Sequence, residues 1–239
     1  MNKVKPGSNM YQGWVTHTWS PMRGCPYQCN YCWVRDFGGQ PETITLNQNI
    51  LREDLGRGNK IFVCHMADMF AADVPDYMVN AVIVHCLKYP NNEYIFQTKN
   101  PGRLESVMDL LPRQSTIGIT IETNRISSRI SQAPDPIKRI TNFLDFKLFA
   151  ATRTNAIFSM SEQWQYFLTI EPIMKFDLEP LMAMIQVIKP DFVNIGADSK
   201  HHNLPEPTYA EVLDLIERIK KAGVVIKIKS NLARLAKVS

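Results

Sequence analysis

The chain has 239 residues, of which 45% are hydrophobic and 21% charged, a composition typical of folded globular proteins and not of disordered or fibrous chains. At roughly 150 residues per domain, this length suits one large domain or two small ones. The 27 basic and 23 acidic residues leave a net charge of +4, which permits a polyanionic partner without arguing for one.

Seven short apolar runs predict β-strands. They lie at residues 14–19, 61–66, 94–98, 116–121, 166–170, 192–195 and 224–229. Most of them lack the alternation of apolar and polar residues that marks a half-exposed strand, so they suit a parallel sheet buried on both faces. Helix patterns lie at residues 45–56, 76–89, 101–111, 178–188 and 208–222. Asp76 follows Pro75 and is the expected N-cap of the second helix.

Strands and helices alternate along the chain, which is typical of repeated βαβ units. We therefore expect an α/β fold in which residues 1–239 form one domain, a partial (β/α) barrel of about six or seven parallel strands with outer helices. Residues 1–12 would be an N-terminal extension. Residues 123–165 are long for a single crossover and are predicted to be either irregular or an extra helical or strand connection, with 146–151 suiting either an extra strand or a helix.

The sequence favours a cytoplasmic protein without membrane contact. Its longest mostly apolar run, residues 77–87, is shorter than the roughly 18 residues that a membrane span needs. The first ten residues, MNKVKPGSNM, lack the apolar core of a signal peptide. The five cysteines are an odd number, which fits poorly with a disulfide framework.

Three of these cysteines, Cys25, Cys29 and Cys32, lie within eight residues of each other, directly after the first predicted strand. In a parallel α/β barrel, the loops that follow the strands form the active face. Three thiolates on a [4Fe–4S] cluster leave one iron open to a ligand, which is what a catalytic metal site requires. The aromatic neighbours of the cysteines would shield such a cluster from water.

This loop, with Tyr31 before its last cysteine, resembles the cluster loop of the radical S-adenosylmethionine (SAM) superfamily. The resemblance implies that the three cysteines bind a [4Fe–4S] cluster whose open iron binds SAM. It implies an external one-electron donor of the flavodoxin or ferredoxin type, and cleavage of SAM to methionine and a 5′-deoxyadenosyl radical that abstracts hydrogen from a substrate. The superfamily fold is a partial or full (β/α) barrel, in agreement with the predicted strands.

Further segments are similar to a phage and prokaryotic radical SAM-like family that is distantly related to spore photoproduct lyases. They are residues 62–70 (FVCHMADMF), 96–104, 117–123, 167–181, 192–199 and 225–235. The resemblance covers most of residues 14–235. Kinship with the lyases makes a nucleobase, a nucleotide or nucleic acid a reasonable substrate, by analogy alone.

Charged or amide side chains follow nearly every predicted strand, where the active face of a barrel collects them. They are Asp68, Lys99, Glu122, Asn124, Glu171, Asp198 and Lys229. Such side chains are rarely fully buried unless they are paired. One interpretation is a set of ion pairs, such as Lys229 with Glu171, that closes the end of the barrel. As a set, they favour a polar chamber over the cluster.

The resemblance also suggests roles for individual residues in binding SAM. Tyr31 would lie near the adenine and Asp68 near the methionyl amino group. Glu122 or Asn124 would bind the ribose hydroxyls. The carboxylate of SAM would pair with a cation, for which the candidates are Lys99, Arg125 and Arg153.

The substrate pocket would collect the remaining candidate catalytic residues, which are Cys64, Lys99, Glu171, Asp198 and Lys229. Cys64 and Cys86 are interpreted first as small buried hydrophobic residues. The alternative is that one of them donates a hydrogen atom to a product radical, as a cysteine does in spore photoproduct lyases.

Other functions stay open at this point. The cysteine loop would bind zinc if His17 or His65 supplied a fourth ligand, which would make the protein a non-enzymatic zinc- or cluster-bearing binding module. A glycyl-radical activase or a small carbacycle-forming radical SAM enzyme is a second alternative.

Overall fold

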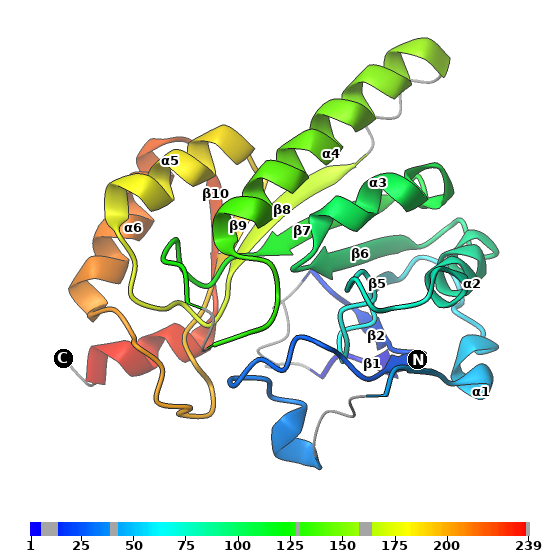
Figure 1. Ribbon diagram of the computed structural model, residues 1–239, viewed down its shortest axis with the longest axis horizontal. Coiled ribbons are helices and arrows are strands. Elements are labelled where there is room, and N and C mark those ends of the chain that lie inside the picture. The colour runs from blue at the N-terminus through cyan, green and yellow to red at the C-terminus, as the bar shows by residue number, and fades with distance from the viewer. Residues whose placement is uncertain (6–13, 39–42, 128–129, 158–163, 238–239) are drawn as a thin grey trace.

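A computed structural model describes residues 1–5, 14–38, 43–127, 130–157 and 164–237, with the backbone alone described for 153–157 (Figure 1). The main sheet has eight strands in the order β1-β2-β5-β6-β7-β8-β9-β10. Their bounds are β1 Asn2–Lys3, β2 His17–Trp19, β5 Lys60–Val63, β6 Glu93–Thr98, β7 Ser115–Thr120, β8 Gln165–Ile170, β9 Phe192–Ile195 and β10 Val225–Ile228. A separate antiparallel pair joins β3 (Met22–Arg23) to β4 (Thr45–Leu46).

The seven predicted strands are all present in the main sheet, and they run parallel to their neighbours. β1 adds an antiparallel edge next to β2. Among the described strands, β1 and β10 end the sheet without pairing to each other, so the barrel is open and not closed.

The helices pack in a layer outside the sheet, as predicted. The longer ones are α2 Asp76–Leu87, α4 Pro136–Ile157, α5 Leu178–Ile188 and α6 Tyr209–Lys221. The short ones are α1 Gln48–Leu51, α3 Leu104–Val107 and the 3₁₀ helices η1 Arg35–Phe37, η2 Pro101–Arg103, η3 Met108–Leu110 and η5 Ser230–Lys237. Figure 1 shows α3, α4, α5 and α6 following one another across the sheet, and neighbours in this row contact each other. No helix within the described residues is both long and apolar enough to cross a membrane.

Side chains on both faces of the sheet are buried, which explains why the strand sequences do not alternate. In β5, Ile61 and Val63 join the core beneath the helices, whereas Phe62 between them joins a second cluster on the opposite face. That second cluster includes Phe167 and Phe192, and the ring of Trp14 packs edge-on against them at centroid distances of 5.5 Å and 4.9 Å. A strand with two buried faces needs apolar residues at every position.

Three predicted strands are shorter in the structure, and the last of them, 224–229, loses one residue at each end. The run 61–66 ends as a strand at Val63, because Cys64 takes a left-handed conformation with φ of 54° and starts a turn closed by Ala67 N to Cys64 O at 3.1 Å. The run 14–19 becomes strand only from His17.

The prediction of a helix over 45–56 is largely wrong. Asn47 caps a short helix from its own side chain, accepting hydrogen bonds from Asn49 N and Ile50 N, so α1 begins only at Gln48. The two residues before Asn47 form β4 instead. The helix ends at Leu51, well before Gly56.

The other helices need smaller corrections. Residues 101–111 break into η2, α3 and η3 instead of one helix. The N-cap of α2 is Pro75, and Asp76 is its first residue, whose carboxylate pairs with Arg103. Residues 146–151, which suited either a strand or a helix, belong to the 22-residue helix α4.

Candidate active site

The carboxyl ends of the strands and the cysteine loop enclose a cavity of about 460 Å³. Cys25, Cys29 and Cys32 line one part of its wall. The ends of β5, β6, β8, β9 and β10 contribute further predicted residues to the lining, which are Cys64, Asp68, Lys99, Glu171, Asp198 and Lys229. Sequence reasoning therefore placed most of its candidate residues around one cavity.

The cysteine loop is fixed by close backbone approaches. Gly24 has φ of 89°, and a Cβ atom there would lie 2.3 Å from Thr43 O, so only glycine fits this position. Asn30 N donates to Ile130 O at 3.0 Å, which joins the loop to the segment before α4. The same segment places Ser131 Oγ 3.0 Å from Cys29 Sγ.

The three thiols form no disulfide; Cys29 is buried, and Cys25 and Cys32 are half-buried. Burial raises the pKa of Cys25 to about 11, and burial also raises the pKa of Cys32. Among the described residues, no three His, Cys, Asp or Glu side chains are arranged to hold a single metal ion. The donor set itself, three thiols of one loop facing one cavity, is the chemistry that soft metals and iron–sulfur clusters require.

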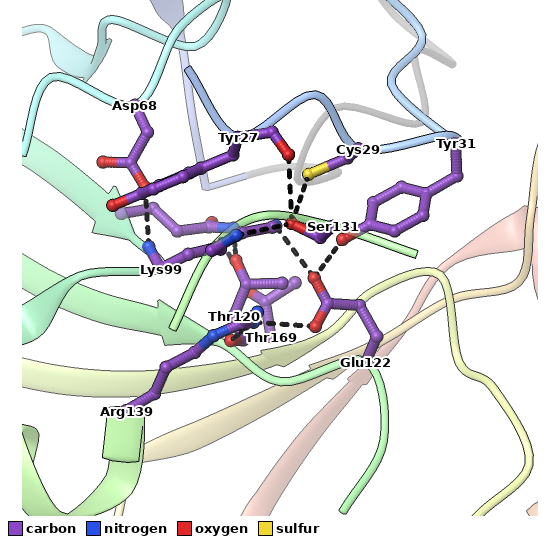
Figure 2. Close-up of polar contacts among 12 residues, drawn as sticks. Tyr27, Cys29, Tyr31, Asp68, Lys99, Thr120, Glu122, Ser131, Arg139 and Thr169 are labelled. Atoms are coloured by element: carbon purple, nitrogen blue, oxygen red, sulfur yellow. Dashed lines mark hydrogen bonds and ion pairs between the residues drawn. The ribbon is translucent and has the colours of Figure 1, made fainter. Parts of the chain in front are cut away.

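Beside the thiols lies a buried charge network centred on Glu122, which is 4% exposed. Lys99 Nζ lies 3.0 Å from Glu122 Oε1, and Arg139 Nη1 lies 2.7 Å from Oε2. The Tyr31 hydroxyl donates to Oε1 as well. Figure 2 shows Tyr31 and Arg139 reaching this carboxylate from opposite sides.

The network determines which of its members are charged. Burial alone would raise the pKa of Glu122, but Lys99 and Arg139 lower it to about 2. Burial would likewise lower the pKa of Lys99, but Glu122 raises it overall. Burial and then Glu122 raise the pKa of the Tyr31 phenol, which stays protonated. Two cations against one carboxylate leave a positive charge beside the cysteine loop.

Asp68 joins the ends of β5 and β6. Its carboxylate accepts from Thr98 Oγ1 at 2.8 Å and from the Lys99 backbone N at 2.7 Å. Burial raises the pKa of Asp68 in spite of these hydrogen bonds. Asp68 therefore positions Lys99 and lines the cavity at the same time.

A second polar group lies after β8 and β10. Lys229 Nζ and Asn231 Nδ2 both donate to Glu171, one to each carboxylate oxygen. The expected Lys229–Glu171 ion pair is therefore present, and both residues also line the cavity. A Cβ atom on Gly196 would lie 2.5 Å from Glu171 Oε1, so Glu171 packs directly on the backbone after β9.

Several predicted residues lie elsewhere. Asn124 exchanges hydrogen bonds with the backbone of Asp177, and Arg125 pairs with the Asp177 carboxylate at 2.6 Å. Of the described residues, neither these two nor Glu122 lines the cavity. Arg153 lies on α4, outside the side chains that the structure describes.

The cysteines and histidines outside the triplet also differ in whether they line the cavity. Cys86 is buried within α2, as expected for a core residue, while Cys64 is buried at the cavity wall. His65 lines the cavity and hydrogen-bonds Ser20 through Nδ1 at 2.7 Å. His17 lies on β2, outside the cavity lining of the described residues.

Sequence reasoning missed three residues of the site. They are Ser131, Arg139 and His202, which contact Cys29, Glu122 and Asp198 respectively. None of the three follows a predicted strand directly, and none belongs to a motif. Asn231, which contacts Glu171, lies among the polar residues that follow the last predicted strand.

Solved structures of other proteins share this fold. A spore photoproduct lyase mutant aligns with a TM-score of 0.62 and 11% identity, covering 96% of this chain and 81% of the lyase chain. SuiB of Streptococcus suis, bound to its precursor peptide SuiA, aligns with a TM-score of 0.62 and 11% identity over 93% of this chain and 50% of SuiB. SuiB bound to S-adenosylmethionine aligns with a TM-score of 0.59 and 9% identity, over 92% and 51% of the two chains. These similarities show an α/β radical SAM-like fold with an open barrel.

The family follows from the sequence itself. Residues 11–147 match the family described as "Protein of unknown function (DUF5131)", and the chain belongs to this family. No curated protein matches the sequence.

Proposed function

We propose that this protein is a radical SAM enzyme. The observation that carries the proposal is that Cys25, Cys29 and Cys32, three unpaired thiols of one loop, face one cavity at the carboxyl ends of a parallel sheet. The fold that positions them is similar to that of SuiB, of which one solved structure holds S-adenosylmethionine. The three thiolates would hold a [4Fe–4S] cluster with one iron open to SAM.

The surroundings of the thiols fit a cluster bound through thiolates. Thiolates need nearby positive charge when water is excluded, and Lys99 and Arg139 both interact electrostatically with Cys29. Ser131 Oγ is close enough to donate a hydrogen bond to the Cys29 sulfur. Hydrogen bonds and charges of this kind tune the potential of an iron–sulfur cluster.

SAM would bind next to the cysteine loop, with Tyr31, Asp68 and Lys99 in the cavity wall. The Lys99 ammonium is the cation available there for a carboxylate, and the Asp68 carboxyl is the acceptor available for an amino group. Glu122 would act indirectly, since it lies behind the wall and holds Lys99 and Tyr31 in place. We do not assign SAM contacts to Asn124 and Arg125, because both are bound to Asp177.

When bound and reduced by an external donor of the flavodoxin or ferredoxin type, the cluster supplies the electron that cleaves SAM and so generates the 5′-deoxyadenosyl radical. The protein would orient the reactants and exclude water. The substrate would lie against Glu171, Asp198 and Lys229, with Cys64 in the same wall. A nucleobase or nucleotide is the favoured substrate class, since one of the similar lyase structures holds a dinucleoside spore photoproduct.

The test is anaerobic reconstitution with iron and sulfide, followed by dithionite and SAM. The proposal predicts the broad charge-transfer absorbance of an iron–sulfur cluster and the formation of 5′-deoxyadenosine. Zinc instead of iron in the purified protein, with no 5′-deoxyadenosine after reconstitution, would favour a zinc-bearing binding module.

Matched cysteine variants test the ligands. Cys29→Ala should lose the cluster absorbance, whereas Cys86→Ala, which removes a buried thiol of α2, should keep it. A Cys29→Ala protein with a full complement of iron would contradict the ligand assignment.

A further inference from the structure

The loop after β9 places an aspartate–histidine pair in the cavity wall. His202 Nδ1 lies 2.7 Å from Asp198 Oδ1, and the His202 backbone N donates to Asp198 Oδ2 at 2.5 Å. Lys200 N also donates to Oδ1, at 3.0 Å. Burial would raise the pKa of Asp198, but hydrogen bonds from Lys200 and His202 lower it overall. An ionised carboxylate can only accept, so Nδ1 is the nitrogen of the ring that carries the proton.

The other ring nitrogen has no such partner. His202 Nε2 is buried and makes no hydrogen bond within the described part of the chain. The carboxylate of Asp36 of η1 faces Nε2, with Oδ2 3.5 Å away, which is within ion-pair distance of a protonated ring but farther than an ordinary hydrogen bond. Buried polar atoms are nearly always hydrogen-bonded, so an exception in a cavity wall indicates a position for a ligand.

The loop that carries the pair is held in a costly conformation. His201 and Asn203, on either side of His202, have φ of 57° and 55°, in the left-handed region. The backbone is fixed from η5, because Arg234 Nε donates to Asp198 O at 3.0 Å and Asn231 Nδ2 donates to Ala197 O at 2.7 Å. Strained backbone that its surroundings hold in place is typical of functional sites.

We propose that His202 Nε2 is the proton acceptor that the cavity offers to its substrate, with Asp198 as the positioning residue. The inference rests on the proposed function in one respect, namely that the substrate enters this cavity. The substrate would present a hydroxyl or an imide N–H to Nε2.

The transfer is a simple acid–base step. The O–H or N–H bond of the substrate breaks, its electron pair stays on the heteroatom, and a new Nε2–H bond forms. The positive charge of the imidazolium is offset by Asp198, and no electron is gained or lost. Asp36 faces the ring from η1. The other charged groups of the cavity wall on this side are Lys200, whose ammonium lies over the Phe37 ring at 5.1 Å, and the Glu171–Lys229 pair.

Nitrogen NMR of histidine-labelled protein tests the pair directly, without iron or SAM. At about pH 9, where imidazole is neutral, His202 should be the Nδ1–H tautomer. The His202 signals are identified as those that disappear in the His202→Gln variant. Asp198→Asn should abolish this preference. A wild-type His202 that carries its proton on Nε2 overturns the proposal.

Diethyl pyrocarbonate, which acylates unprotonated imidazole nitrogens, tests whether Nε2 is available. His202 should be acylated at Nε2, and the rate should fall about tenfold in Asp198→Asn, since an orienting carboxylate raises the basicity of a ring nitrogen. His17, outside the cavity, should react equally in both proteins. An unreactive His202, or an equal rate in both proteins, contradicts the inference.

These outcomes are separate from those of the proposed function. A protein that shows the predicted tautomer and reactivity but does not cleave SAM would overturn the radical SAM function and leave the His202 site in place. A protein that cleaves SAM but has its proton on Nε2 would overturn the inference alone.

Discussion

Arg139 of α4 donates to Glu122 at the end of β7, with Nη1 and Oε2 separated by 2.7 Å, and both side chains are buried. The Tyr31 hydroxyl donates to the other oxygen of the same carboxylate. This one carboxylate therefore connects three parts of the chain: the cysteine loop, the sheet, and a helix that the sequence left undefined. The predictions below begin with it.

Glu122→Gln should destabilise the fold strongly. The substitution leaves Lys99 and Arg139 without their buried counter-ion, and breaking a buried pair in this way costs about 3 to 5 kcal/mol. The free energy of unfolding, from urea titration at pH 7, measures the effect. The control is Glu179→Gln, which removes an exposed partner of Arg218 and should change stability little. Equal effects of the two substitutions would contradict the network.

The same residue predicts a pH dependence. The folded-state pKa of Glu122 is about 2, below its ordinary 4.5, so its contribution to stability is fully present above about pH 4.5 and decreases as the pH falls towards 2. The difference in unfolding free energy between wild type and Glu122→Gln should therefore shrink between pH 5 and pH 3. A difference that stays constant over this range would mean that Glu122 is not held ionised by its neighbours.

Gly24→Ala should disrupt the cysteine loop. The new Cβ would lie 2.3 Å from Thr43 O, in addition to the strain at φ of 89°. Gly38→Ala is the matched control, because Gly38 has φ of 109° but nothing within 4 Å of the added atom. We expect the free energy of unfolding to fall by about 1 to 2 kcal/mol in Gly38→Ala, from strain alone. In Gly24→Ala it should fall by about 1 to 3 kcal/mol more, because the added atom also overpacks the loop. Urea titration of both variants measures the difference, and equal losses would contradict the close approach.

Gly196→Ala should separate Glu171 from its partners. Its Cβ would lie 2.5 Å from Glu171 Oε1 and 2.9 Å from Asn231 Oδ1, so the carboxylate must move away from Lys229 and Asn231. We expect a loss of stability of about 1 to 3 kcal/mol. In a double-mutant cycle, the variant with both Gly196→Ala and Glu171→Gln should lose less stability than the sum of the losses in the two single variants. Strict additivity would show that the two positions do not interact.

The strands were predictable because burial on both faces requires continuous apolar runs, and all seven parallel strands begin or end within a few residues of those runs. The end of β5 was not predictable, since nothing in the sequence marks the left-handed turn at Cys64. The prediction of a helix over 45–56 failed because the side chain of Asn47, inside that range, caps a helix that begins only after it.

The candidate site was predictable where its residues lie shortly after the strands, as Asp68, Lys99, Glu171 and Asp198 do. Parallel topology brings such residues to one edge of the sheet. Arg139 and His202 were not predictable. Arg139 meets Glu122 from the first turns of α4, and His202 meets Asp198 through a strained loop, and only the folded structure defines these approaches. Asn124 and Arg125 follow the same strand as Glu122 but turn to Asp177 instead.

The central claim is that Cys25, Cys29 and Cys32 hold a [4Fe–4S] cluster with one iron open to SAM. Electron paramagnetic resonance of the reconstituted, reduced protein before and after addition of SAM tests it most directly. The account predicts the signal of one reduced [4Fe–4S] cluster per chain, with a spectrum that changes when SAM binds the open iron and that is lost in Cys29→Ala. A spectrum that SAM leaves unchanged, or no cluster signal at all, would contradict it.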